Sequence, residues 1–204
     1  YGFESKIEKS NRVIAQVMVL NAKKTILFNP IAKFSRGQIN ALVEHEVGVH
    51  MVTTMNSNAQ KLHRFNLGLP VNTMTQEGLA ILSEYLSGNI SMKRLKKLAY
   101  RVIIVDMMCN GADFLECYNF LVNDHNLDQD DAFSVVTRIF RGGGFTKDYL
   151  YLSGFVKILR MWENDQDLEP LLVGKTSLEF HSVISEMIQR EMVQKPIYIT
   201  NSFI

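Results

Sequence analysis

The residues whose types and spacing could carry out a reaction lie in the segment from Glu44 to His50, which reads EHEVGVH. His45 and His50 offer two imidazole nitrogens, and Glu46 places a carboxylate beside the first of them. Glu77, in a later segment, offers a further carboxylate. Catalytic zinc sites of this kind use three protein ligands, keep a fourth position for water, and need a glutamate that accepts a proton from that water. The segment therefore predicts a metallopeptidase core.

The spacing of the two histidines is one residue longer than in the familiar H-E-x-x-H pattern. On a regular helix, positions i and i+4 lie about 40° apart and positions i and i+5 about 140° apart. A straight α-helix would therefore aim His45 and His50 in different directions. The π-helix repeats from i to i+5 and often occurs at functional sites, and Gly48 tolerates the distortion. We expect a π-bulge or local unwinding between residues 44 and 50 that brings both imidazoles to one ion.

Each acidic residue also has an ordinary explanation. Glu46 and His50 form an i, i+4 pair of the kind that supports a helix. Glu77 is expected in the first turn of the next helix, where the helix dipole favours an acid. Glu84 shares the helix face of Glu77, and it is either a hydrogen-bonding partner of a ligand or a solvated residue.

Two helices must position these side chains. Ser35 offers an N-cap for the first, which is expected to run from about residue 36 to residue 56. Its apolar positions share one face: they are Ile39, Leu42, Val43 and Val47. Residues 56–74 are polar and rich in helix breakers, so they predict a loop. Thr73 and Gln76 resemble a capping box, which places Glu77 in the first turn of the second helix.

The remaining sequence predicts further helices after an N-terminal hairpin. Residues 11–19 are rich in β-branched residues and predict a strand, residues 21–24 a turn, and residues 25–28 a return strand. An edge strand beside a metal helix can hold extended substrate by backbone pairing, although an ordinary structural hairpin is the alternative. Amphipathic patterns predict helices after Ser91, near 114–122, after Asp128, over 155–162 and over 177–190.

Composition sets the class of protein. With 204 residues and 47% hydrophobic content, the chain can bury one substantial core. The formal net charge of +1 gives no reason to expect binding to nucleic acid or to an anionic membrane. No apolar run approaches the length of a transmembrane helix. Cys109 and Cys117 are too few for a disulfide framework, so a reducing, cytoplasmic location is expected. The chain lacks an initiator methionine and a signal peptide, so it is expected to be a fragment.

Three motifs together resemble a known family. They are H-E-V-G-x-H, Q-E-G-L-A at residues 76–80, and the run from Arg138 to Asp148, which is followed by Tyr151, Leu152 and Gly154. The pattern is similar to the bacterial QEGLA-motif proteins, labelled flavohaemoglobin-expression modulators, and to the eukaryotic microtubule-associated tyrosine carboxypeptidases. One departure is Val49, where many relatives have threonine, but this removes no ligand.

The resemblance implies a mainly helical α+β fold with a zincin/gluzincin-like metallopeptidase core and an N-terminal hairpin or small antiparallel sheet. It implies one Zn²⁺ held by His45, His50 and Glu77, with Glu46 as general base. The family's domain is longer, so residues 1–204 are expected to form a single catalytic domain that lacks its N-terminal part. The implied substrate is the C-terminus of a peptide or protein, with an aromatic residue such as tyrosine at its end.

A carboxypeptidase also needs a cation for the terminal carboxylate of its substrate. Arg138, Arg141 and Lys147 are the candidates because they flank the glycines at 142–144, where the backbone can approach a ligand closely. An arginine there could equally cap a helix C-terminus. Tyr151 could donate a hydrogen bond to the oxyanion, or it could be an amphipathic core residue.

The function predicted from the sequence is zinc-dependent removal of a C-terminal residue. A non-catalytic, zinc-binding regulatory protein is the first alternative, and four protein ligands around the metal would favour it. An aminopeptidase is the second, and it would need an acidic anchor for the substrate amine in place of Arg141 or Lys147.

Overall fold

A computed structural model of the protein describes residues 1–13, 16–20, 23–142 and 146–204. The chain is mainly helical, and it divides into two compact units. Unit 1 consists of Tyr1–Asn89 and Gly154–Ile204, and unit 2 consists of Ile90–Ser153. That both units belong to one catalytic domain stays a prediction.

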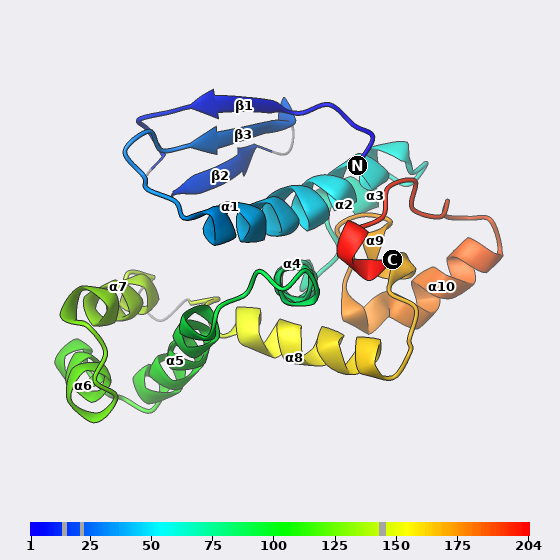
Figure 1. Ribbon diagram of the computed structural model, residues 1–204. Coiled ribbons are helices and arrows are strands. Elements are labelled where there is room, and N and C mark those ends of the chain that lie inside the picture. Colours follow the sequence, from blue (N-terminus) through cyan, green and yellow to red (C-terminus); the bar gives the residue numbers. More distant parts are fainter. Residues whose placement is uncertain (14–15, 21–22, 143–145) are drawn as a thin grey trace. The chain divides into compact units, whose positions relative to one another are not determined.

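A small mixed sheet stands at the start of unit 1 (Figure 1). It contains β1 (Lys6–Lys9), β2 (Val17–Leu20) and β3 (Thr25–Phe28), in the order β1-β3-β2. Strands β2 and β3 pair antiparallel, which confirms the predicted hairpin, whereas β1 pairs parallel to β3. The small antiparallel sheet expected as the alternative to a hairpin is instead a mixed sheet.

The strand boundaries also differ from those expected. β2 begins at Val17 rather than at Asn11, which lies in a turn, and Ile14 and Ala15 lie outside the described residues. Strand β1 was not predicted because its four residues, KIEK, are too few and too polar to show an alternation of apolar and polar side chains. All four are exposed in the structure. The predicted turn falls partly on residues 21–22, which also lie outside the described residues.

The first predicted helix is one continuous helix in three parts. It comprises α1 (Arg36–Leu42), the π-helix η2 (Val43–Met51) and α2 (Val52–Ala59). Ser35 and Gln38 form a reciprocal capping box, which confirms Ser35 as the N-cap. The helix continues beyond residue 56, and the short helix α3 (Arg64–Leu67) also interrupts the predicted loop.

Helix α4 (Asn72–Leu86) carries the Q-E-G-L-A motif and packs against η2. The capping box predicted at Thr73 was wrong, because the N-cap is Val71, which is left-handed and makes no side-chain cap hydrogen bond. Glu77 therefore lies beyond the first turn, and the helix dipole has less influence on it there.

Two glycines let α4 approach α8 (Leu150–Glu163) closely (Figure 1). A Cβ atom on Gly78 would lie 2.6 Å from the carbonyl carbon of Gly154. A Cβ atom on Gly154 would in turn meet the carbonyl oxygen of Met74. The glycine of the Q-E-G-L-A motif and Gly154 are thus needed for the same helix contact.

The remaining elements of unit 1 come from the C-terminal part of the chain. It contains α9 (Glu169–Leu172), the 3-10 turn η4 (Leu178–Phe180), α10 (His181–Gln189) and the 3-10 turn η5 (Asn201–Phe203). The helix predicted over 177–190 is therefore a 3-10 turn followed by α10. A core cluster joins these elements to α3, and it consists of Phe65, Val173, Ile184 and Val193.

Unit 2 contains α5 (Met92–Cys109), α6 (Phe114–Asn119), a second π-helix η3 (Phe120–Asp124) and α7 (Gln129–Phe140). Ser91 and Asp128 cap α5 and α7, as their sequence positions predict. The core includes Ile104, Cys117, Leu121, Val136 and Ile139. No helix among the described residues has the length and apolar character to cross a membrane.

Candidate metal centre

The π-helix determines where the two histidines point. In η2 the N–H of Val52 donates to the carbonyl oxygen of Val47, five residues earlier. His45 and His50, also five residues apart, consequently lie one above the other on the same side of the helix, and their ring centroids are 4.9 Å apart. The π turn predicted from the histidine spacing is confirmed.

Glu77 joins the two histidines from α4. Its Oε2 atom lies 3.3 Å from Nε2 of His45 and 3.7 Å from Nε2 of His50. One potential ligand atom from each of the three side chains lies within 4.8 Å of the other two. The structure therefore brings together the three residues named from the sequence, and their role as zinc ligands stays a prediction.

Glu84 fixes the orientation of His45. This glutamate is buried on α4, and its Oε1 atom lies 2.7 Å from Nδ1 of His45. When Nδ1–H donates to this carboxylate, Nε2 faces Glu77, and it is the nitrogen that can bind a metal once it has lost its proton. Metal-binding histidines usually have such a partner on the other ring nitrogen. Of the two possibilities that the sequence left open for Glu84, the solvated one was wrong.

The electrostatics of the cluster favour a positive charge. Burial opposes the charged imidazolium of His45, but hydrogen bonds to Glu77 and Glu84 outweigh it and raise the pKa of His45 to about 9. Burial likewise opposes the charged form of Glu77, but hydrogen bonds from both histidines hold its pKa well below the usual range. Two nitrogen donors and one carboxylate that stabilise a proton in this way suit a divalent cation such as Zn²⁺.

Glu46 lies next to His45 in sequence and contributes to the negative potential that raises the pKa of that histidine. It borders an apolar pocket of about 140 Å³ in unit 1. The other lining residues come from the sheet, from the connection that follows it, and from the continuous helix formed by α1, η2 and α2, which we call the metal helix. They include Ile7, Val17, Phe28, Phe34, Leu42 and Val47. A half-buried carboxylate beside an apolar pocket is suited to act on a substrate bound there.

A second buried bond ties the metal helix to α4. The hydroxyl oxygen of Thr53, three residues after His50, lies 2.8 Å from Oε1 of Gln76. The same hydroxyl is within hydrogen-bonding distance of the carbonyl oxygens of Val49 and His50. Because Gln76 precedes Glu77, this contact helps to fix the carboxylate relative to the two histidines.

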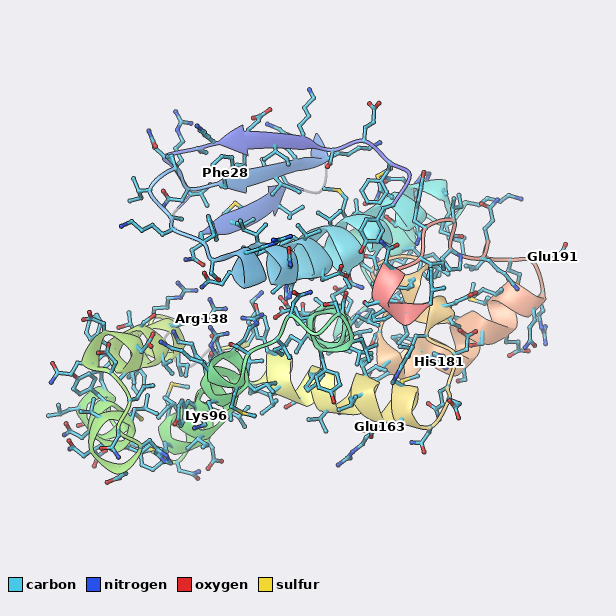
Figure 2. All side chains as sticks on the ribbon, viewed as in Figure 1. Phe28, Lys96, Arg138, Glu163, His181 and Glu191 are labelled. Atoms are coloured by element: carbon cyan, nitrogen blue, oxygen red, sulfur yellow. The ribbon has the colours of Figure 1, made fainter. Side chains whose placement is uncertain are left out.

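The other predicted site residues lie in unit 2, where two of them belong to a cluster. Arg138 on α7 (Figure 2) donates from Nε to Oδ1 of Asp148, and its Nη2 lies 3.4 Å from the hydroxyl oxygen of Tyr151. The Nη1 atom of Arg101 lies 3.8 Å from the same Asp148 oxygen. Both guanidinium groups are 5.7 Å from the centroid of the Tyr151 ring. The structure thus brings Arg138 and Tyr151 together around a buried aspartate.

Arg141 and Lys147 do not join this cluster. Both are exposed, and Arg141 is the C-cap residue of α7. Gly143 and Gly144 lie outside the described residues, so the predicted glycine loop is described only at Gly142. Substrate binding by Arg138, Arg141 and Lys147, and oxyanion binding by Tyr151, stay predictions.

Comparison with known proteins identifies the chain's relatives. The family model described as microtubule-associated tyrosine carboxypeptidase matches residues 1–204. The chain belongs to this family. It is 28% identical over 195 residues to microtubule-associated tyrosine carboxypeptidase 1 of Homo sapiens, and 26% identical over 192 residues to the protein of that name from Rattus norvegicus. Each alignment covers 86% of this chain and 39% of the relative, so the chain spans about two fifths of the relatives' length.

Membership in the microtubule-associated tyrosine carboxypeptidase family confirms the resemblance drawn from the three motifs. Two positions that matter in this member were missed from the sequence. Thr53 has no motif of its own, and only its spacing from His50 could have drawn attention to it. Arg101 belongs to no motif in the sequence. In the structure burial, followed by repulsion from Arg138, lowers its pKa to about 10.

Proposed function

We propose that the chain binds one Zn²⁺ through His45, His50 and Glu77 and hydrolyses the last peptide bond of a peptide or protein substrate. The observation that carries this proposal is the convergence of the three side chains from η2 and α4. Among the described residues the cluster offers three potential protein ligands. This number suits a catalytic zinc with an open position, whereas the regulatory alternative calls for four.

The chain's own residues divide the proposed work. A bound Zn²⁺ would supply Lewis acidity and lower the pKa of water toward 7. Glu46 accepts a proton from the attacking water and delivers it to the leaving amine nitrogen. Glu84 keeps Nε2 of His45 turned toward Glu77, which lies 3.3 Å away. The tyrosine and basic residues of unit 2 enter the proposal only as candidates, Tyr151 for the oxyanion and Arg138, Arg141 and Lys147 for the terminal carboxylate.

The proposed substrate ends in tyrosine or a similar aromatic residue. The relatives' names specify a tyrosine carboxypeptidase that is associated with microtubules. The apolar pocket beside Glu46 supports this choice, because apolar walls with one polar group at the edge suit an aromatic side chain. β2 is an edge strand and contacts η2, so it is a candidate for backbone pairing with extended substrate.

A pair of matched peptides tests the proposal. Zn²⁺-loaded protein is incubated with a peptide ending in tyrosine and with the same peptide bearing a C-terminal amide, and the products are identified by mass spectrometry. We expect the free-acid peptide to lose one C-terminal residue and the amide to react much more slowly. Trimming from the amino end would indicate an aminopeptidase. No cleavage by a fully zinc-loaded protein would contradict the proposal and favour the regulatory alternative.

A further inference from the structure

The π-helix leaves one backbone carbonyl without the partner that it would have in an α-helix. In an α-helix the N–H of Val52 would donate to the carbonyl oxygen of Gly48, four residues earlier. Here it is directed to the carbonyl oxygens of Val47 and Val49 instead. The π segment ends at Met51, where the helix returns to the α register, and the N–H of Val52 does not donate to the oxygen of Gly48. A buried carbonyl left unpaired destabilises the structure that contains it.

A threonine from the far end of the chain supplies the missing donor. Thr200 is fully buried, and its hydroxyl donates to the carbonyl oxygen of Gly48 at 2.6 Å. In the α register Val52 would donate to the same oxygen, so the bond from Thr200 contributes most in the π register, where this oxygen lacks the N–H of Val52. The hydroxyl of Thr200 therefore favours the helix geometry that brings His45 and His50 together.

The segment around Thr200 is held firmly on both sides. Asn56, buried on α2, accepts hydrogen bonds from the N–H groups of Ile197 and Tyr198 and donates to the carbonyl oxygen of Tyr198. Beyond Thr200, the hydroxyl of Ser202 lies 2.8 Å from that of Ser83 on α4. Thr200 is thus fixed relative to both helices that carry the proposed zinc ligands.

We propose that Thr200 is a positioning residue of the metal centre, whose hydroxyl holds η2 in the π register required for His45 and His50 to share one ion. The inference rests on the proposed zinc site but not on the peptidase reaction. Loss of this hydroxyl should weaken Zn²⁺ binding even though Thr200 touches none of the three ligands. Residues that orient ligands in this indirect way commonly contribute 10- to 100-fold to metal affinity.

The test compares variants that differ by one hydroxyl. Thr200→Val keeps the shape of the side chain and removes the donor, whereas Thr200→Ser keeps the donor. Zn²⁺ affinity is measured by competition with a chelator, and the visible spectrum of the Co²⁺-loaded protein reports the coordination geometry. We expect Zn²⁺ binding by Thr200→Val to be about 10- to 100-fold weaker with an altered Co²⁺ spectrum, and Thr200→Ser to resemble the wild type.

Thr176→Val is the matched control. Thr176 is equally buried and donates to a carbonyl oxygen, that of Leu171 at 2.9 Å, which lies outside the metal helix. The Thr176→Val substitution should lower thermal stability while leaving Zn²⁺ affinity and the Co²⁺ spectrum unchanged. If Thr200→Val cannot be purified, Thr200→Ala is compared with Thr176→Ala in the same way. Unchanged Zn²⁺ affinity, or an equal loss in both positions, would overturn this inference alone. A wild-type protein that binds no Zn²⁺ would overturn it together with the proposed function.

Discussion

At the scale of single residues, the proposed chemistry depends on two glutamates with different surroundings. Glu84 orients His45 from a buried position on α4. Glu46 is half-buried and borders the apolar pocket, where a carboxylate can exchange a proton with water. Glu84 is thus suited to support a ligand, and Glu46 is suited to act as a base.

Replacing the base should separate catalysis from metal binding. Glu46→Gln keeps the size of the side chain but cannot accept the proton of the attacking water. We expect the variant to bind Zn²⁺ as the wild type does and to lose nearly all hydrolysis of the tyrosine-terminated peptide. Metal content by atomic spectroscopy and product analysis by mass spectrometry check both statements. If Glu46→Gln lost its metal, Glu46 would have to be reassigned as a ligand or a structural residue.

Replacing Glu84, which orients His45, should weaken metal binding and leave the chemical step intact. Glu84→Gln keeps the shape but weakens the charge-assisted bond to Nδ1 of His45. We expect Zn²⁺ affinity to fall about 10- to 100-fold and activity to recover at saturating Zn²⁺. Chelator competition gives the affinity, and the rate is measured across a Zn²⁺ titration. An affinity equal to that of the wild type would show that the contact does not serve the metal centre.

At the scale of elements, the position of Glu77 depends on how closely α4 can pack. Gly78 follows Glu77 directly and meets Gly154 of α8 on its other side. A side chain at either glycine would push α4 away from α8, and α4 is also packed against η2. The contact between the two glycines therefore helps to determine where the carboxylate lies relative to the histidines.

An added methyl group tests this packing. Gly154→Ala should destabilise unit 1 by about 2 kcal/mol or more, in the range for overpacked cores, because the new Cβ would collide with backbone atoms. Gly37→Ala is the control: Gly37 lies in α1, and a Cβ there would meet no atom within 4 Å, so alanine should stabilise the protein by about 0.5–1 kcal/mol. Denaturant unfolding measures both. Equal effects would mean that the glycine contact is not tightly packed.

At the scale of the whole molecule, each unit holds its own cluster of charged residues. Unit 1 holds the metal cluster, and unit 2 holds Arg101, Arg138 and Tyr151 around Asp148. Asp148 is buried, and its charge is compensated by Arg138 and Arg101, whether or not Arg138 also binds a substrate carboxylate.

Substitution of Arg138 should show its structural role first. Arg138→Ala leaves Asp148 with Arg101 as its neighbouring cation, and we expect unit 2 to lose on the order of 2 kcal/mol. Hydrogen exchange should then rise in α7 and its neighbours in unit 2 and stay unchanged in α4. Arg141→Ala removes an exposed cation and should leave exchange unchanged. If Arg138 also binds substrate, KM rises in Arg138→Ala more than kcat falls. Unchanged hydrogen exchange would contradict the structural role.

The sequence predicted the parts of the fold that depend on local spacing. The five-residue spacing from His45 to His50 requires a π turn if both are to face one ion, and the serine before residue 36 is a local capping signal. It could not predict β1, whose four exposed residues include three charged ones and show no pattern, or the left-handed cap at Val71. It left the role of Glu84 open and missed the partners of Thr53 and Thr200. Those contacts join segments far apart in the chain, and only tertiary packing selects them.

X-ray absorption at the zinc edge tests the central claim most directly. For protein loaded with one Zn²⁺ per chain, we expect two imidazole nitrogens and oxygen ligands at about 2.0–2.2 Å, with the histidine signal reduced in His50→Ala. Sulfur ligands at about 2.3 Å, or a spectrum that His50→Ala leaves unchanged, would contradict the proposed zinc site.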